Sequence, residues 1–152
     1  MFLNEEVFCN VVRFAPLVSI DIIIQKGEEI LLGKRKNPPA KEFYFTMGGR
    51  IFKNEKIENA LNRIGKNELN RTLKESEVEF LGVFEHFYTE SICDKNISTH
   101  YVNLAYVLEV ESFDISTLPF EQHSSYKWWN KKALLQSPQV HHYVKDYFKK
   151  GI

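Results

Sequence analysis

The run from Leu17 to Gln25 (LVSIDIIIQ) is the feature that most constrains how this chain folds. It is rich in β-branched residues and follows Pro16, so it predicts a strand. Lys26-Gly27-Glu28 is expected to be a turn, and Glu29 to Gly33 is expected to return as the second strand of a hairpin. The chain is therefore expected to be built around a sheet.

Later segments add strands to this sheet. Pro38-Pro39 interrupts a loop before the third strand, and Pro119 to Ser125 predicts another loop before the last one. The additional strands are expected at Phe43–Met47, Val78–Phe87 and His100–Val110, and around Tyr126–Trp129. Strands interleaved with few helices predict an α+β domain, with a mixed β-sheet sandwiched between α-helices.

Three segments have helical patterns. Asn4 is a candidate N-cap for a short helix that ends near Arg13. A second helix is expected from Glu55 to Leu69, with Asn54 as N-cap and Asn70 closing it in the left-handed conformation. The third, at the C-terminus, is expected to pack on the sheet through one apolar stripe formed by Val140, Tyr143, Val144, Tyr147 and Phe148.

Composition narrows the class of protein. The 152 residues suit one domain spanning 1–152, and 20 basic against 20 acidic residues give no overall case for a nucleic-acid or membrane partner. Cys9 and Cys93 form neither a disulfide framework nor a metal-spaced cluster, and Cys93 is interpreted as incidental. With no apolar run of about 20 residues and an acidic N-terminus, we expect a reduced, cytoplasmic protein.

The stretch from Gly49 to Asn70 carries the most chemical information. Gly49, Glu55, Arg63 and Glu68 stand at the spacing of the Nudix box, a motif of the Nudix hydrolase superfamily that the stretch resembles. The chain departs from the motif at five positions, of which two replace glutamates and one replaces the final glycine; the residues are Ile64, Gly65, Asn67, Asn70 and Arg71.

These departures predict a reduced metal site. Positions 64, 67 and 68 fall on one helical face, because three and four residues are each about one turn. Only Glu68 is acidic there. One carboxylate cannot hold several divalent ions, so we expect a single Mg²⁺ per subunit, with Mn²⁺ as a substitute, completed by phosphate oxygens, water and neutral oxygen ligands.

The chain also resembles one branch of that superfamily, the GDP-mannose mannosyl hydrolases. The resemblance covers nearly the whole chain and rests on an ordered set of segments: MFL, VVR, PLVSID, LLGKR with NPPA, GGR, the reduced box, FEHFY, THYV and EQH. It implies the Nudix fold and hydrolysis of GDP-mannose or GDP-glucose to GDP and free sugar. It also implies a homodimer in which residues 1–16 are exchanged between subunits.

The resemblance further implies roles for individual residues. Gly48, Glu68 and Gln122 would bind Mg²⁺, and His123 would be the general base that deprotonates water for attack at the anomeric carbon with inversion. Four residues would contact the diphosphate, namely Arg35, Arg50, Arg63 and Tyr101. GDP leaves as a stabilised anion, so no carboxylic acid is needed to protonate it.

Several assignments have a structural alternative. Asp21 and His86 would lie near the sugar or the reacting centre, but His86 is equally well explained as a core histidine. Glu55 is at least as well explained as a residue that orients Arg63. The candidates for stacking on guanine also suit a core or dimer interface; they are Tyr88, Phe2 and Phe8.

The sequence is also compatible with two other functions. A Nudix diphosphatase would cleave the P–O–P bond of a sugar nucleotide or nucleoside triphosphate. A catalytically inactive Nudix module would bind a nucleotide or protein without turnover, and the lost glutamates motivate that alternative. Glu68, the Gln122-His123 pair and the arginines argue against it, because a binding module has no need of a base.

Overall fold

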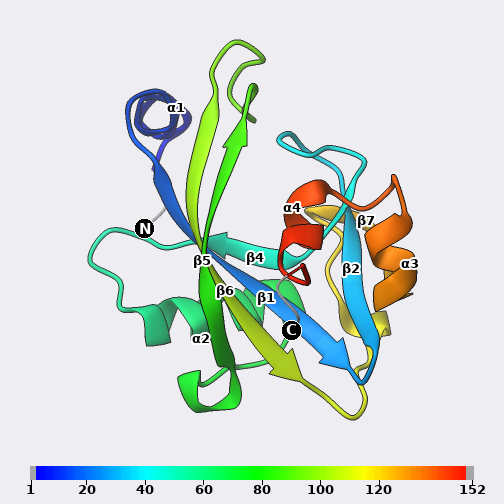
Figure 1. Cartoon of the computed structure of the whole chain (residues 1–152). Helices are drawn as coiled ribbons and strands as arrows, with labels where there is room; N and C mark the ends of the chain where they lie inside the picture. Colours follow the sequence, from blue (N-terminus) through cyan, green and yellow to red (C-terminus); the bar gives the residue numbers. More distant parts are fainter. Residues whose placement is uncertain (1–2, 150–152) are drawn as a thin grey trace.

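The computed structural model describes residues 3–149, in which seven strands form one mixed sheet with helices on both faces (Figure 1). The main path of the sheet runs β3-β2-β1-β6-β5, while β4 pairs with β1 and β7 pairs with β2. The strands are β1 (Leu17–Lys26), β2 (Glu29–Arg35), β3 (Tyr44–Phe45), β4 (Met47–Arg50), β5 (Glu79–Tyr88), β6 (Thr99–Glu109) and β7 (His123–Asn130). The predicted α+β class is confirmed.

Strand β1 organises the sheet because it changes partner along its length. It runs parallel to β6 from Leu17 to Gln25, and its last residues pair antiparallel with β2 as the predicted hairpin. Its earlier residues, Ser19 to Ile22, pair instead with β4. Strand β2 therefore diverges from β1 at the point where β4 comes alongside it.

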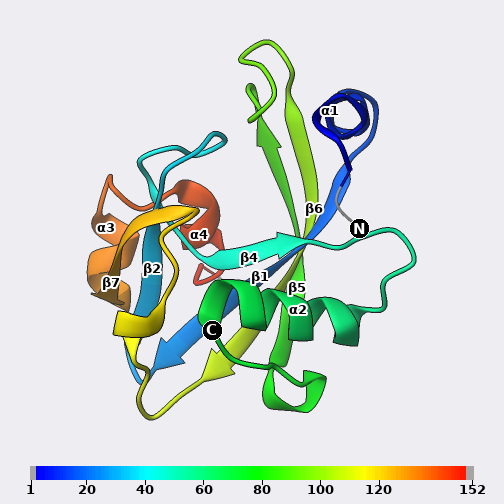
Figure 2. The same cartoon turned by 180° about the vertical axis from the view of Figure 1, so that it is seen from behind.

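The alternation of side chains along β1 separates two cores. Ile20, Ile22 and Ile24 are fully buried on the face covered by α2 (Ile57–Leu69), which Figure 2 shows in front of the sheet. Ile23 faces the opposite side and packs in a second cluster with residues of α3 (Lys131–Gln136) and α4 (His142–Asp146). Ser19 and Asp21 share that second face by alternation.

Helix α2 confirms the predicted helix except at its start. Asn70 closes it in the left-handed conformation (φ 53°), as expected. Lys56, rather than Asn54, is the N-cap, and Asn54 lies in the preceding turn with φ 66°. No helix within residues 3–149 is long and apolar enough to cross a membrane.

The C-terminal region differs from the single helix expected there. Helix α3 was not predicted, although Asn130 caps it by accepting a hydrogen bond from the Lys132 amide (2.9 Å). Helix α4 is short, and its apolar stripe is continued by a turn that buries Tyr147 and Phe148. Val140 precedes the helix in an isolated bridge to Tyr44.

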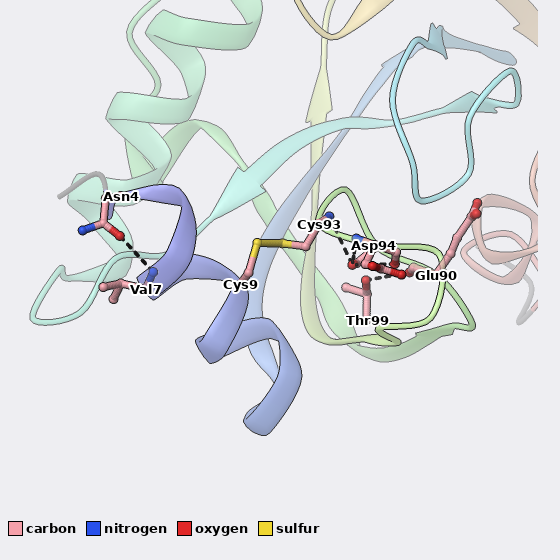
Figure 3. Close-up of a disulfide and its surroundings, with 8 residues drawn as sticks. Asn4, Val7, Cys9, Glu90, Cys93, Asp94 and Thr99 are labelled. Carbon is pink, nitrogen blue, oxygen red and sulfur yellow. Dashed lines mark hydrogen bonds between the residues drawn. A yellow bond between two sulfur atoms is a disulfide. The ribbon is translucent and has the colours of Figure 1, made fainter.

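Helix α1 (Glu5–Phe14) is covalently tied to the loop between β5 and β6. Asn4 caps it by accepting from the Val7 amide, as expected. Cys9 and Cys93 form a disulfide (Figure 3), so the expectation of reduced cysteines and an incidental Cys93 is wrong. The two residues are 84 positions apart, and only the fold reveals that α1 lies beside this loop. A cytoplasmic location stays a prediction.

Candidate functional site

A polar cavity of about 220 Å³ lies where β1 parts from β2 and pairs with β4. Most of the predicted site residues line it. Its walls come from every strand of the sheet and from the loops before β3, β4 and β7, through Ser19, Asp21, Arg35, Pro39, Phe45, Thr46, Gly48, Gly49, Arg50, His86, Tyr88, Tyr101, Gln122 and His123. A second hollow shares Gly48, Gly49, Arg50 and Gln122 with it and extends toward Glu68 and α1.

Glu68 and Gln122 meet at this second hollow although 54 residues separate them. Glu68 is 7% exposed, and the Gln122 side-chain amide donates to its Oε1 (3.0 Å). Burial raises the pKa of the Glu68 carboxyl to about 7, and no ion pair within residues 3–149 involves it. A carboxylate, an amide oxygen and the Gly48 carbonyl are oxygen donors suited to Mg²⁺, so the residues fit the expected ion.

Packing accounts for one of the two missing box glutamates, the one that Ile64 replaces. Ile64 is 1% exposed and belongs to the core cluster under the sheet, where it lies against Gly49. A Cβ at Gly49 would lie 3.1 Å from Ile64 Cγ1, so the glycine lets α2 approach β4. Asn67 faces solvent. Within the described residues no group of three or more His, Cys, Asp or Glu side chains could share a metal ion.

Glu55 and Arg63 form a structural brace. The Arg63 guanidinium donates to both Glu55 oxygens (2.8 and 2.9 Å) and to the Arg50 carbonyl (2.7 Å), and it stacks over Phe52. Glu55 also accepts from the Phe52 amide, and its hydrogen bond with Arg63 holds its pKa below the usual value. These contacts match the alternative in which Glu55 orients Arg63. The contacts of Arg63 hold the end of β4 in place.

The other predicted phosphate-binding groups line the cavity. Arg35 stands at the end of β2, and its Nε donates to the Pro39 carbonyl (2.8 Å). Arg50 ends β4, and its guanidinium carbon lies 5.2 Å from the ring centroid of Phe8 and 4.9 Å from that of Phe52. Tyr101 lies in β6, paired with Leu17. Both arginines line the cavity and give it a basic character suited to a diphosphate.

His123 is the first residue of β7, not part of the preceding loop as expected. It pairs with Arg35 in the sheet register and is 1% exposed. Its ring lies against Gly33, where a Cβ would be 2.6 Å from His123 Cδ2. Neither ring nitrogen has a hydrogen-bond partner within residues 3–149, and burial lowers the pKa of the imidazole to about 4. The ring is therefore neutral at pH 7, with a nitrogen free to accept a proton.

Asp21 is the buried carboxyl of the cavity. It is 8% exposed, and its Oδ2 accepts from the Thr46 hydroxyl (2.9 Å) and from the Tyr147 hydroxyl. Its Oδ1 lies close to Gly48. Burial raises the pKa of this carboxyl to about 6, against the lowering effect of the Tyr147 and Thr46 hydrogen bonds.

His86 and Tyr88 belong to an aromatic cluster beside Asp21. The His86 ring stacks on Tyr143 (centroids 4.3 Å apart, planes 13°), and its Nε2 has no partner in residues 3–149. Burial lowers the pKa of His86 to about 4. His86 is thus buried like a core residue and also lines the cavity. The ring centroids of Tyr88 and His141 are 5.6 Å apart, and His141 Nδ1 accepts a hydrogen bond from the Tyr143 amide at the start of α4.

The aromatic candidates for stacking lie in different places. Tyr88 is in the polar cavity, whereas Phe8 projects from α1 into the neighbouring hollow over Arg50. Ile92, next to the disulfide, borders the same hollow. Phe2 lies outside the described residues.

Some polar residues of the site were not predicted. Ser19 and Thr46 line the cavity, and Asn103 and Tyr147 lie behind it in one hydrogen-bonded network with Asp21. The sequence holds a signal for Ser19, because Ser19 and Asp21 are polar residues at alternate positions of an otherwise apolar strand and therefore share one face. Tyr147 was expected only as part of an apolar stripe.

Sequence comparisons give the relatives of the chain. A family model described as the NUDIX domain matches residues 15–149. The low-salt glycan biosynthesis protein Agl8 of Haloferax volcanii is 36% identical over 137 residues, covering 88% of this chain and 83% of that protein. An ADP-ribose pyrophosphatase of Methanocaldococcus jannaschii is 31% identical over 118 residues, covering 68% of this chain and 65% of that enzyme.

Solved structures share the fold. The MutT NUDIX hydrolase of Burkholderia pseudomallei superposes with a TM-score of 0.71 at 23% identity, covering 90% of this chain and 98% of that one. The NUDIX domain of Shewanella oneidensis NrtR, solved with ADP ribose, gives a TM-score of 0.63 at 18% identity, covering 96% and 95%. With a family model across most of the chain and a sheet that carries the box helix on one face, the protein belongs to the Nudix family.

Proposed function

We propose that the protein hydrolyses a GDP-sugar, GDP-mannose or GDP-glucose, to GDP and free sugar. One observation carries the proposal: Glu68 is the one buried carboxylate of α2, and it meets Gln122 beside a cavity that holds His123. This donor set supports one metal ion on the phosphates and a base placed elsewhere, at the sugar end of the substrate.

In the proposed reaction a water oxygen bonds to the anomeric carbon as the bond from that carbon to the phosphate oxygen breaks. The electron pair of the broken bond leaves with GDP, and a nitrogen of His123 accepts the water proton. Attack opposite to the leaving group inverts the anomeric centre. The two unpartnered ring nitrogens of His123 support this assignment.

Charge on the departing diphosphate is held by the basic walls. Arg35 and Arg50 would bind phosphate oxygens directly, with Tyr101 donating a hydrogen bond, while Arg63 keeps the end of β4 in place. Glu68, Gln122 and the Gly48 carbonyl would hold Mg²⁺, which when bound supplies further neutralisation of phosphate charge.

A sugar-containing substrate has support from the comparisons. The Haloferax relative carries a name from glycan biosynthesis and matches this chain over most of both lengths. The name gives no reaction, so the choice of bond rests on the donor set of the site.

A Nudix diphosphatase is the second candidate, and the comparisons favour it more directly than C–O cleavage. The Methanocaldococcus relative is an ADP-ribose pyrophosphatase, and ADP ribose is itself a sugar nucleotide. In that reaction water would attack phosphorus and give a nucleoside monophosphate and a sugar phosphate. The carboxylate-poor helix is the observation that argues for the first candidate instead.

Product analysis in ¹⁸O-water distinguishes these candidates. Purified protein is incubated with GDP-mannose and, separately, with ADP-ribose, each with and without Mg²⁺. We expect GDP and ¹⁸O-labelled mannose, formed only with Mg²⁺. GMP with mannose 1-phosphate, or label in phosphate, would contradict C–O cleavage, and binding without any product would favour an inactive nucleotide-binding module.

We also propose a homodimer, with residues 1–16 contributing to the interface. Large apolar side chains that remain exposed support it. Phe14 is 79% exposed, and Val83 and Phe87 of the edge strand β5 are each 58% exposed. Val18 is 42% exposed. It lies on the same sheet face as Val83, because it is two residues from Ile20, and Ile20 and Val83 both pair with Leu104. Burial of such a patch favours association.

A further inference from the structure

We propose that Tyr147 is a positioning residue for Asp21, so that the segment after α4 completes the sugar end of the cavity. The inference rests on the proposed function, because it assigns Asp21 to the hydroxyl groups of the sugar. Tyr147 itself lies behind the cavity, and its hydroxyl acts through the carboxylate.

The geometry places Tyr147 in the middle of a buried hydrogen-bonded chain. The Ser19 hydroxyl donates to Asn103 Oδ1 (2.9 Å), and Asn103 Nδ2 donates to the Tyr147 hydroxyl (2.7 Å). That hydroxyl donates in turn to Asp21 Oδ2. Tyr147 and Asn103 are fully buried, so water does not compete for these bonds.

This chain of hydrogen bonds fixes which oxygen of Asp21 faces the substrate. Thr46 and Tyr147 both donate to Oδ2, so the carboxylate is held from two sides through one atom. Oδ1 remains on the Gly48 side, where the cavity lies. No ion pair within residues 3–149 involves Asp21, and its two shortest hydrogen bonds come from the neutral hydroxyl groups of Thr46 and Tyr147. A carboxylate fixed in this way can accept hydrogen bonds from sugar hydroxyls.

The same segment makes a second contact with the site. Tyr143 of α4 stacks on His86, and its hydroxyl is anchored by the Phe87 backbone, accepting from the amide (2.8 Å) and donating to the carbonyl (2.9 Å). Figure 1 shows α4 against the sheet on the face opposite to α2. Tyr143 and Tyr147 therefore each contact a residue predicted to lie near the sugar. Tyr143 contacts His86, and Tyr147 contacts Asp21.

Tyr147→Phe tests the inference, because it removes only the hydroxyl. We expect kcat to fall about tenfold or more, as for other residues that orient a site from behind, while GDP affinity by calorimetry is unchanged. Thr99→Val is the matched control: Thr99 is 3% exposed, and its hydroxyl donates to the Glu90 carbonyl (2.8 Å) away from the cavity. This control is expected to lose stability but not turnover.

A double-mutant cycle with Asp21→Asn separates positioning from general destabilisation. If Tyr147 acts through Asp21, adding Tyr147→Phe to Asp21→Asn changes kcat less than twofold. The same fold-loss in both backgrounds, or no loss in either, would overturn the inference. The cycle uses the substrate that the wild type hydrolyses and measures the products that the wild type forms. If the wild type releases GMP, the proposed function is contradicted, but the test of Tyr147 still applies.

A crystal structure of Tyr147→Phe gives a readout that does not depend on turnover. We expect Asp21 to leave its position beside Gly48, with the rest of the sheet unchanged. An Asp21 side chain that keeps its place would show that Thr46 suffices to hold it, and the positioning role would be refuted.

Discussion

His123 combines deep burial with two unpaired ring nitrogens, and its replacement tests the proposed base directly. Because burial lowers its pKa to about 4, the imidazole is in the proton-accepting form above about pH 5. We expect His123→Gln to lower kcat by about 10²- to 10⁴-fold, the usual contribution of a general base, and to leave GDP affinity nearly unchanged. Steady-state kinetics and calorimetry measure the two.

His100→Gln is the control for that prediction. Among the described residues His100 Nε2 likewise has no hydrogen-bond partner, but its ring stacks on Phe87 (centroids 4.5 Å apart) outside the cavity. Its variant should turn over normally. Normal turnover by His123→Gln would remove His123 from the mechanism.

Glu68 illustrates a conflict between stability and function. Its folded-state pKa is raised from 4.5 to about 7, so the fold favours the protonated form. The stability from this preference is present below pH 4.5 and is lost as pH rises through about 7. Without metal at pH 8, Glu68→Gln should therefore raise the free energy of unfolding by about 1–2 kcal/mol, or Tm by about 3–6 °C, and also abolish Mg²⁺-dependent turnover.

Differential scanning calorimetry at two pH values tests this prediction. The gain should be present at pH 8 and vanish near pH 4.5, and the exposed Glu111→Gln variant should show neither effect. A gain of equal size at both pH values would mean that the charge of Glu68 is not its source.

Among the elements, α2 depends on a glycine where the Nudix box has a hydrophobic residue. A Cβ on Gly65 would lie 2.6 Å from the Arg71 carbonyl oxygen and 2.8 Å from Leu73 Cγ. Helix propensity alone favours alanine over glycine by about 1 kcal/mol. The overlap with backbone costs about 1–3 kcal/mol, so we expect Gly65→Ala to lower the free energy of unfolding. Urea titration measures the free energy of unfolding, with the exposed Lys66→Ala as the control. A Gly65→Ala variant more stable than the wild type would contradict the close approach.

The disulfide supports an element that has little packing of its own. Helix α1 buries only Val12 among its ten residues, and Cys9 links it to Cys93 across 84 positions. A bond that closes so long a loop contributes about 2–4 kcal/mol. We expect reduction to lower the free energy of unfolding by that amount in the wild type and to leave the Cys9→Ser/Cys93→Ser variant unaffected. An equal response of both proteins would point to an effect of the reductant alone.

How far the sequence predicts these elements depends on whether their determinants are local. The Asn4 and Asn70 caps and the β1–β2 hairpin depend on neighbouring residues, and each was predicted. His123 was expected in a loop because its strand is defined by pairing with β2, which sequence periodicity does not report. The disulfide and the Asp21–Tyr147 contact join residues 84 and 126 positions apart, and only the folded chain brings them together.

At the scale of the whole molecule, the exposed edge strand β5 argues for association. Val83, Glu85 and Phe87 lie on one face of β5, so two large apolar side chains, each 58% exposed, stand beside the last strand of the sheet path. Natural proteins cover or charge such edges. The proposed dimer would cover this one.

Sedimentation velocity tests that arrangement. The wild type should sediment as a dimer, and Val83→Lys/Phe87→Lys should sediment as a monomer, because two lysines on the patch would have to be desolvated on association. Leu135→Lys is the matched control, since Leu135 is 38% exposed on α3 and should leave the dimer intact. A wild type that is monomeric at every concentration would refute the dimer, and a dimer that survives both lysines would place its interface elsewhere.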